Sequence, residues 1–145
     1  MSNETAKNFG HPATTVAETD RWLVLVRPKQ PTFGSLVLVC KDEAKAFSDL
    51  SAEAFADLQQ AIKGVEELLR AKVGYQKINY LMLMMVDPDV HFHVIPRYEG
   101  ERQYSGLDFP DAGWPGAPAL ASAVELSPEM LTQLTADFRK AWPSL

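Results

Sequence analysis

The chain has 145 residues and a net charge of -5, and 46% of its residues are hydrophobic. This composition fits one globular domain that can bury a core without disulfides, and the single cysteine can form no internal bridge. The acidic balance, without a long basic run, argues against duplex nucleic acid as a partner. No apolar stretch approaches the roughly 20 residues that cross a bilayer, and the N-terminus lacks the apolar core of a signal peptide. We therefore expect a cytoplasmic protein that does not bind membranes.

The first part of the chain predicts an arm followed by two paired strands. Residues 1–19 are polar and aperiodic, which predicts a flexible N-terminal arm before a single domain over residues 20–145. The β-branched and aromatic run 21–27 predicts a strand that ends at Pro28, because proline has no amide to donate. A second apolar strand is predicted at 35–39. The short link between the two strands indicates antiparallel pairing.

A long amphipathic helix is predicted next. Ser51 is typical of a helix N-cap, and the helix is expected to run for about 20 residues and to end near Gly74. Apolar residues recur within it at three- and four-residue spacing, which predicts one buried stripe against a sheet. The stripe consists of Phe55, Leu58, Ile62, Val65 and Leu69.

The second half predicts a hairpin, a loop and a final helix. Strands are expected at 77–85 and 90–97, with the methionine-rich end of the first packed in the core. Residues 99–126 are rich in glycine and proline and predict a long loop, and a last helix is expected to begin at Ser127. Together these elements predict an α+β fold, with an antiparallel sheet of about five strands, one long helix and a C-terminal helix.

Two of the three histidines fall on one strand. Side chains alternate between the faces of a strand, so Asp89, His91 and His93 share a face. Imidazoles in an apolar strand cost free energy unless they are hydrogen-bonded or line a cleft. The pattern fits structural histidines, metal ligands, or a histidine nucleophile that attacks phosphorus. Because His11 and Cys40 are the few further nitrogen and sulfur ligands, we expect no metal and no other cofactor.

The run Asp89-Val-His91-Phe-His93-Val-Ile-Pro-Arg97 resembles the signature of the histidine triad family. That signature is His-φ-His-φ-His-φ-φ, often followed by Pro-Arg, where φ is apolar. Upstream, Gly34-Ser35-Leu-Val-Leu-Val and the helix after it are similar to the second landmark of the family. The resemblance covers about residues 20–100. It is closest to the fragile histidine triad and bacterial dinucleoside polyphosphate hydrolase branches.

The resemblance implies roles for four residues. The middle histidine of the family is the nucleophile, which falls on His91, and the third contacts and orients phosphate, which falls on His93. Asp89 stands in place of the first histidine, so the triad is degenerate, and we expect its carboxylate to orient His91. Ser35 stands in place of a further upstream histidine and is expected to donate to a phosphate oxygen.

The resemblance also implies a substrate and a partner. Arg27, in place of a nucleotide-binding Asn, is a candidate nucleotide-binding residue, and so is Arg97. Trp22, as a large aromatic residue, is expected either in the core or as a wall on which the base of the nucleotide stacks. The implied function is a nucleotide phosphohydrolase or nucleotidyl transferase that cleaves dinucleoside polyphosphates or nucleoside phosphoramidates at the α-phosphorus, through a covalent histidine intermediate. The alternatives are a catalytically weak or silent nucleotide-binding protein and a metal-dependent hydrolase. Members of the family commonly form homodimers with a continuous sheet.

Overall fold

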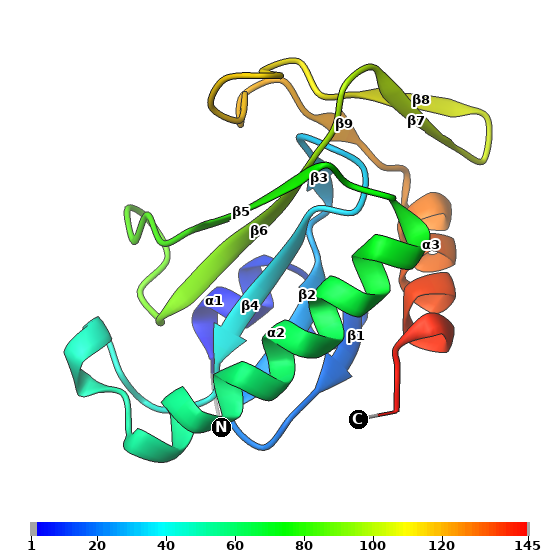
Figure 1. Ribbon diagram of the computed structural model, residues 1–145. Coiled ribbons are helices and arrows are strands. Elements are labelled where there is room, and N and C mark those ends of the chain that lie inside the picture. Colours follow the sequence, from blue (N-terminus) through cyan, green and yellow to red (C-terminus); the bar gives the residue numbers. More distant parts are fainter. Residues whose placement is uncertain (1–2, 145) are drawn as a thin grey trace.

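A computed structural model describes residues 3–144, and its centre is a five-stranded antiparallel sheet (Figure 1). The strands lie in the order β1 (Thr15–Glu18), β2 (Trp22–Val26), β4 (Leu36–Cys40), β6 (His91–Arg97) and β5 (Lys77–Leu81). Two short ladders lie outside this sheet: β3 (Lys29–Gln30) pairs with β9 (Val124–Glu125), and β7 (Glu101–Tyr104) with β8 (Leu107–Pro110). The predicted α+β fold class is confirmed.

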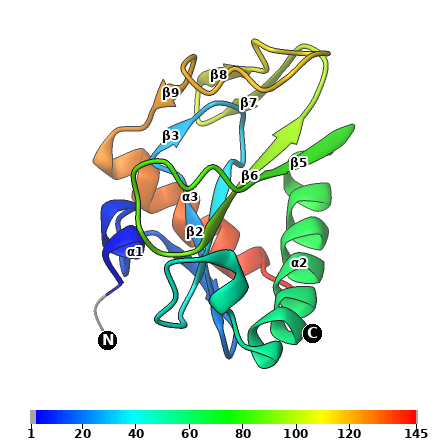
Figure 2. The same ribbon diagram turned by 90° about the vertical axis from the view of Figure 1, so that its left-hand side faces the viewer.

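Helices lie on both faces of the sheet (Figure 2). The long helix α2 (Ala52–Lys72) lies on one side and the short helix α1 (Glu4–Asn8) on the other. The C-terminal helix α3 (Pro128–Ala141) packs into the same apolar cluster as α2, and a 3-10 turn, η1 (Phe47–Asp49), precedes α2. The site described below is on the α1 face.

The central strands are buried on both faces. Every residue of β2 and β4 is buried, which explains why both read as continuous apolar runs rather than as alternating ones. The residues that point toward α2 and α3 include Trp22, Val24, Val26, Leu36 and Leu38. The residues that point toward α1 form a smaller cluster of Ala6, Leu23, Leu25, Val37 and Val39. Full burial of each large side chain contributes about 1.5–3 kcal/mol. The two clusters therefore stabilise β2 and β4 and, through the β4–β6 ladder, also β6.

The long helix begins where its sequence indicates, but its buried stripe is shifted. Ser51 accepts a hydrogen bond from the amide of Ala54, as an N-cap does. Ala54 is fully buried because its carbonyl accepts from the Trp22 indole at 2.8 Å, which brings the small residue onto the sheet. Phe55, one position further round, is therefore 45% exposed and packs on Phe47 instead. Val65 and Leu69 are buried as predicted.

The N-terminal segment contains regular structure that the sequence does not predict. Asn3 caps α1 by accepting from the Ala6 amide at 2.8 Å, and its side-chain amide donates to the carbonyl of Cys40. Strand β1 then pairs with β2 at one edge of the sheet. These elements depend on contacts with residues distant in sequence, which is why local periodicity gives no sign of them.

The segment expected to be a loop over 99–126 contains a packed hairpin. Strands β7 and β8 turn through Ser105 and Gly106, both with positive φ, which suits a two-residue hairpin turn. Phe109 is fully buried against Phe33. The hydroxyl of Tyr98 donates to the main-chain carbonyl of Phe109 at 2.7 Å. Charged residues on the exposed side of the hairpin interrupt the run of β-branched and aromatic residues by which a strand is predicted from sequence.

The methionine-rich run is core only in part, because Met82 and Met84 are partly buried against the core whereas Leu83 and Met85 are exposed. Strand β5 ends at Leu81, and Met84 adopts a positive φ of 52° that turns the chain out of the sheet. Met85 and Val86 are then 83% and 90% exposed. The connection from β5 to β6 is therefore an exposed apolar loop.

Candidate active site

His91 is held in one tautomer at the start of β6. Its Nδ1 lies 2.7 Å from the main-chain carbonyl oxygen of Asp89, and the residue is 2% exposed. A carbonyl oxygen can only accept, so Nδ1 carries the proton and Nε2 keeps its lone pair. An imidazole fixed in this way is prepared to act as a nucleophile through Nε2.

His93 lies beside His91 and is held neutral. The two rings are 5.1 Å apart, nearly perpendicular, and the Nδ1 atom of His93 is buried without a hydrogen-bond partner. Burial lowers the pKa of His93 to about 4, and the positive charge of Arg27 acts in the same direction. His93 is therefore uncharged at neutral pH.

The depressed pKa of His93 makes the stability of the fold depend on pH. The unfolded chain takes up a proton on this residue below about pH 6.5, whereas the folded chain resists it until about pH 4. We expect the free energy of unfolding to fall as the pH is lowered through this window, and to fall less in His93→Asn. Urea denaturation at a series of pH values measures this change. An equal loss of stability in His93→Asn would assign the pH dependence to other groups.

The ring of Phe9 covers the two histidines. Its centroid lies 6.2 Å from that of His91 and 5.7 Å from that of His93. Phe9 follows directly after α1, which lies on this face of the sheet (Figure 2). A segment with no predicted structure therefore forms one wall of the site.

Asp89 fastens α1 to the histidine strand. Its carboxylate accepts from the Thr5 amide at 3.0 Å and pairs with Lys45 at 2.7 Å, while its own amide donates to the Thr5 hydroxyl. Burial alone would raise the pKa of the Asp89 carboxyl, but the bonds from Lys45 and Thr5 outweigh it and hold the pKa below its usual value. The carboxylate thus binds α1, and Asp89 orients His91 through its main-chain carbonyl instead.

A small cationic pocket adjoins the histidines on the β2 side. It has a volume of about 180 Å³ and is lined by Asn8, Phe9, Arg27, Pro28 and Lys29. The Arg27 guanidinium donates from Nη1 to the carbonyl of Lys29 at 2.7 Å, but its Nε is buried without a partner. We call this space the Arg27 pocket.

A larger pocket lies along β5, on the other side of β6. Its volume is about 670 Å³, and it is lined by residues 77–81, Arg97 and the loop 114–118. Leu81 pairs directly with His93 across the β5–β6 ladder, so this pocket also reaches the histidine row. The pair of histidines therefore lies between a small cationic space and a larger one.

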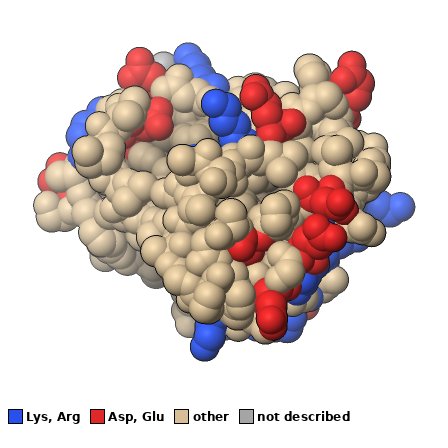
Figure 3. Space-filling view, turned by 90° about the horizontal axis from the view of Figure 1, so that it is seen from above, with Lys and Arg blue, Asp and Glu red and all other residues tan. Residues whose placement is uncertain are grey.

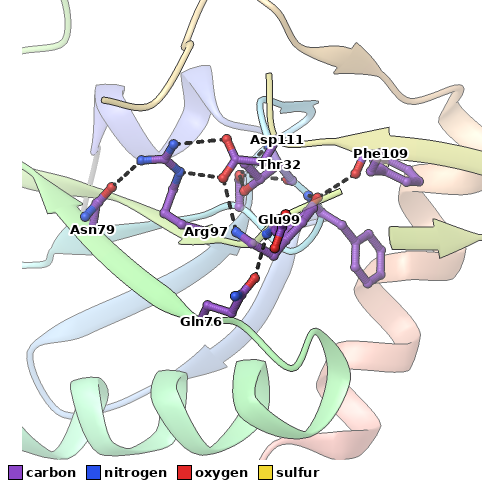
Figure 4. Close-up of polar contacts among 10 residues, drawn as sticks. Thr32, Gln76, Asn79, Arg97, Glu99, Phe109 and Asp111 are labelled. Atoms are coloured by element: carbon purple, nitrogen blue, oxygen red, sulfur yellow. Dashed lines mark hydrogen bonds and ion pairs between the residues drawn. The ribbon is translucent and has the colours of Figure 1, made fainter. Parts of the chain in front are cut away.

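Arg97 is held within the protein at the far end of β6. It donates to both carboxylate oxygens of Asp111 at 2.7 and 3.0 Å and to the Asn79 side-chain oxygen at 2.9 Å (Figure 4). The side chains of Arg97 and Asp111 are almost completely buried. This arginine serves the fold, and we do not assign it to nucleotide binding.

Two further sequence candidates lie away from the site chemistry. The Trp22 indole is fully buried on the α2 face, opposite the histidines, so it cannot form a wall for a nucleotide there. The Ser35 hydroxyl is buried and donates to the carbonyl of Thr32 at 2.8 Å, which commits its proton to a local turn. His91, His93 and Arg27 are the candidates that the fold brings together.

The remaining surface and ligand features limit the chemistry. Within residues 3–144, no three His, Cys, Asp or Glu side chains lie together as metal ligands. No helix in the described part of the chain is long and apolar enough to span a membrane. From the end that carries β7, β8 and β9, acidic and basic side chains are interspersed around a largely uncharged face (Figure 3).

The sequence matches the model of the HIT domain family over residues 8–100. The chain belongs to this family. Two solved structures similar in fold are a histidine triad protein from Bradyrhizobium japonicum and the Plasmodium falciparum diadenosine triphosphate hydrolase in complex with Cyclomarin A. The first has 20% identity and a TM-score of 0.74, with 99% of this chain and 98% of that chain covered. The second has 13% identity and a TM-score of 0.64, with 89% and 76% covered.

The HIT fold also occurs within a longer protein. The NitFhit protein of C. elegans has 19% identity and a TM-score of 0.66, and the match covers 89% of this chain. This chain spans 27% of that protein. No curated protein matches the sequence. At these identities, the structural likeness shows the fold.

Proposed function

We propose that this HIT-fold protein hydrolyses or transfers nucleotides at the α-phosphorus, with His91 as the nucleophile. The observation that carries the proposal is the 2.7 Å contact between His91 Nδ1 and the Asp89 carbonyl, which selects the neutral tautomer with its lone pair on Nε2. The neutral His93 ring lies 5.1 Å from the His91 ring, and the positive charge of Arg27 is close enough to act on His93. The substrate class is a dinucleoside polyphosphate or a nucleoside phosphoramidate.

The reaction proceeds in two displacements at one phosphorus atom. The Nε2 lone pair of His91 attacks, an N–P bond forms, and the leaving group departs with the electrons of its bond to phosphorus. Water then attacks the same phosphorus, the N–P bond breaks, a water proton passes to solvent, and His91 regains its lone pair. We assign the contact with the oxygens of this phosphate to His93, whose ring lies beside that of His91.

The comparisons support the choice of a dinucleoside polyphosphate as substrate. One structure of similar fold is that of a diadenosine triphosphate hydrolase. The separation of a small cationic pocket from a larger one suits a substrate with a charged part and a bulkier part.

A second candidate function is nucleotide binding with weak or no turnover. The cover of Phe9 over the histidines favours it, because His91 and His93 are only 2% and 8% exposed. In this case the fold holds a nucleotide without bringing its phosphorus to Nε2.

Strand β5 is an edge of the five-stranded sheet, and we propose that it pairs with a second copy, as the family resemblance implies.

The proposed function predicts chelator-resistant release of nucleoside monophosphate and a trapped adduct. The purified protein is incubated with diadenosine triphosphate and with adenosine phosphoramidate, with and without EDTA, and AMP release is followed. Mass spectrometry of quenched samples is expected to find AMP on the peptide that contains His91. Turnover without this adduct would contradict the covalent mechanism, and binding without AMP release would favour the second candidate.

A further inference from the structure

The Arg27 pocket contains two cationic side chains and adjoins His93. We propose that it is a second phosphate subsite, which holds a phosphate group of the substrate other than the one that His91 attacks. The inference rests on the proposed function and narrows its substrate class to nucleotides with at least two phosphate groups. The second group belongs either to the polyphosphate chain or to the ribose.

The first argument is the pair of buried polar atoms without partners. Within residues 3–144, three buried side-chain polar atoms lack a hydrogen-bond partner, and two of them are Arg27 Nε and His93 Nδ1. Native proteins satisfy the large majority of such atoms, so two in one neighbourhood indicate a missing ligand. Because Nε of a guanidinium can only donate, that ligand must present an acceptor, as a phosphate oxygen does.

The second argument is the charge of the pocket. Neither Arg27 nor Lys29 takes part in an ion pair in the described structure, and no carboxylate lines the pocket. Glu125 lies opposite Lys29 in the β3–β9 ladder, but their side chains form no ion pair. The Asp87 carboxylate accepts a hydrogen bond from the Asn8 side chain. Burial lowers the pKa of Arg27, the direction expected of a charge that lacks its counterion.

The third argument is position along the sheet. The amide of Arg27 donates to the carbonyl of Ser35, and the β4–β6 register, in which Val37 pairs with His93, extends to place Ser35 beside Ile95. Arg27 therefore lies across β4 from β6 and is offset by two residues from the row of His93, on the same face of the sheet. Phe9 contacts the His93 ring and also lines the pocket, so one ligand can touch both.

The fourth argument is size. A volume of about 180 Å³ equals roughly six waters, at about 30 Å³ each in the liquid. This space admits a phosphate group, whereas a nucleoside is better accommodated in the 670 Å³ pocket beside β5. The small pocket therefore selects for charge rather than for a base.

Binding without turnover tests the inference. Calorimetry compares AMP with α,β-methylene-ADP, which adds a phosphate on the chain, and with adenosine 3′,5′-bisphosphate, which adds one on the ribose. We expect one of the two to bind wild type at least about 10-fold more tightly than AMP, since charge-assisted hydrogen bonds are the strong ones. Which of the two gains affinity identifies the source of the second phosphate.

Arg27→Gln is expected to remove this advantage and to change AMP affinity by less than about 3-fold. Arg70→Gln, on the exposed surface of α2, is the matched control and should keep the advantage. Thermal unfolding checks that both variants fold. Equal affinities of wild type for all three ligands, or an advantage that survives Arg27→Gln, would overturn the inference while leaving the proposed function in place. Failure of wild type to bind any of the nucleotides would overturn both.

Discussion

His91→Ala is expected to reduce kcat by a factor on the order of 10,000 or more, because it removes the atom that forms the N–P bond. The neighbouring His93 is not expected to replace it, since its Nδ1 is buried and it lies at a different position in the sheet, opposite Val37 and Leu81, whereas His91 lies opposite Val39. Steady-state AMP release and calorimetric nucleotide affinity are measured together. We expect affinity to change by less than about 10-fold, because the imidazole is small relative to the two pockets that hold the substrate.

Two matched variants separate nucleophilic attack from orientation. His93→Ala should keep measurable turnover, reduced by roughly 100-fold, because the role we propose for this residue is to contact the phosphate without forming the covalent bond. Asp89→Asn preserves the main-chain carbonyl that fixes the His91 tautomer and loses the ion pair with Lys45, so its main effect is expected on the attachment of α1. A His91→Ala variant with near wild-type turnover would exclude the covalent mechanism.

The elements with strong local signals could be predicted from the sequence. Ser51 and Ser127 cap their helices because a hydroxyl reaches the third amide beyond it, a contact that needs no distant partner. The strands β2 and β4 are continuous apolar runs, which burial on both faces requires. By contrast, α1 depends on Asp89 and Cys40, more than thirty residues away along the chain.

The site could be predicted only in part. The alternation of a strand places His91 and His93 on one face, and the two rings lie 5.1 Å apart. The roles expected of Ser35 and of the Asp89 carboxylate overlooked their hydrogen-bond partners within the protein. The Ser35 hydroxyl donates to the Thr32 carbonyl, and the Asp89 carboxylate accepts from the Thr5 amide. Phe9 and Lys29 were missed as site residues, since only the folded chain brings Phe9 beside the histidines and into the pocket that Lys29 also lines.

Asp111→Ala is expected to lower the free energy of unfolding by about 3–5 kcal/mol, which makes it the most destabilising single change proposed. Asp111 is buried and accepts from the Arg97 guanidinium at two oxygens and from the Tyr98 amide at 3.1 Å (Figure 4). Its removal leaves the Arg97 charge buried without its counterion, and Asn79 offers only one neutral acceptor. Urea denaturation measures the loss.

The double variant Arg97→Met/Asp111→Leu decides whether the loss comes from the unpaired charge. Removing one partner of a buried ion pair leaves the other charge buried without its counterion. Replacing both partners with apolar groups of similar volume often leaves the free energy of unfolding unchanged. We therefore expect the double variant to recover most of the stability that Asp111→Ala loses. If it is as unstable as Asp111→Ala, the loss instead reflects the bond from the Tyr98 amide, which neither replacement restores. Because Arg97 ends the strand that carries His91 and also lines the 670 Å³ pocket, recovery of stability without recovery of nucleotide affinity would show that the ion pair shapes this pocket as well as holding the fold.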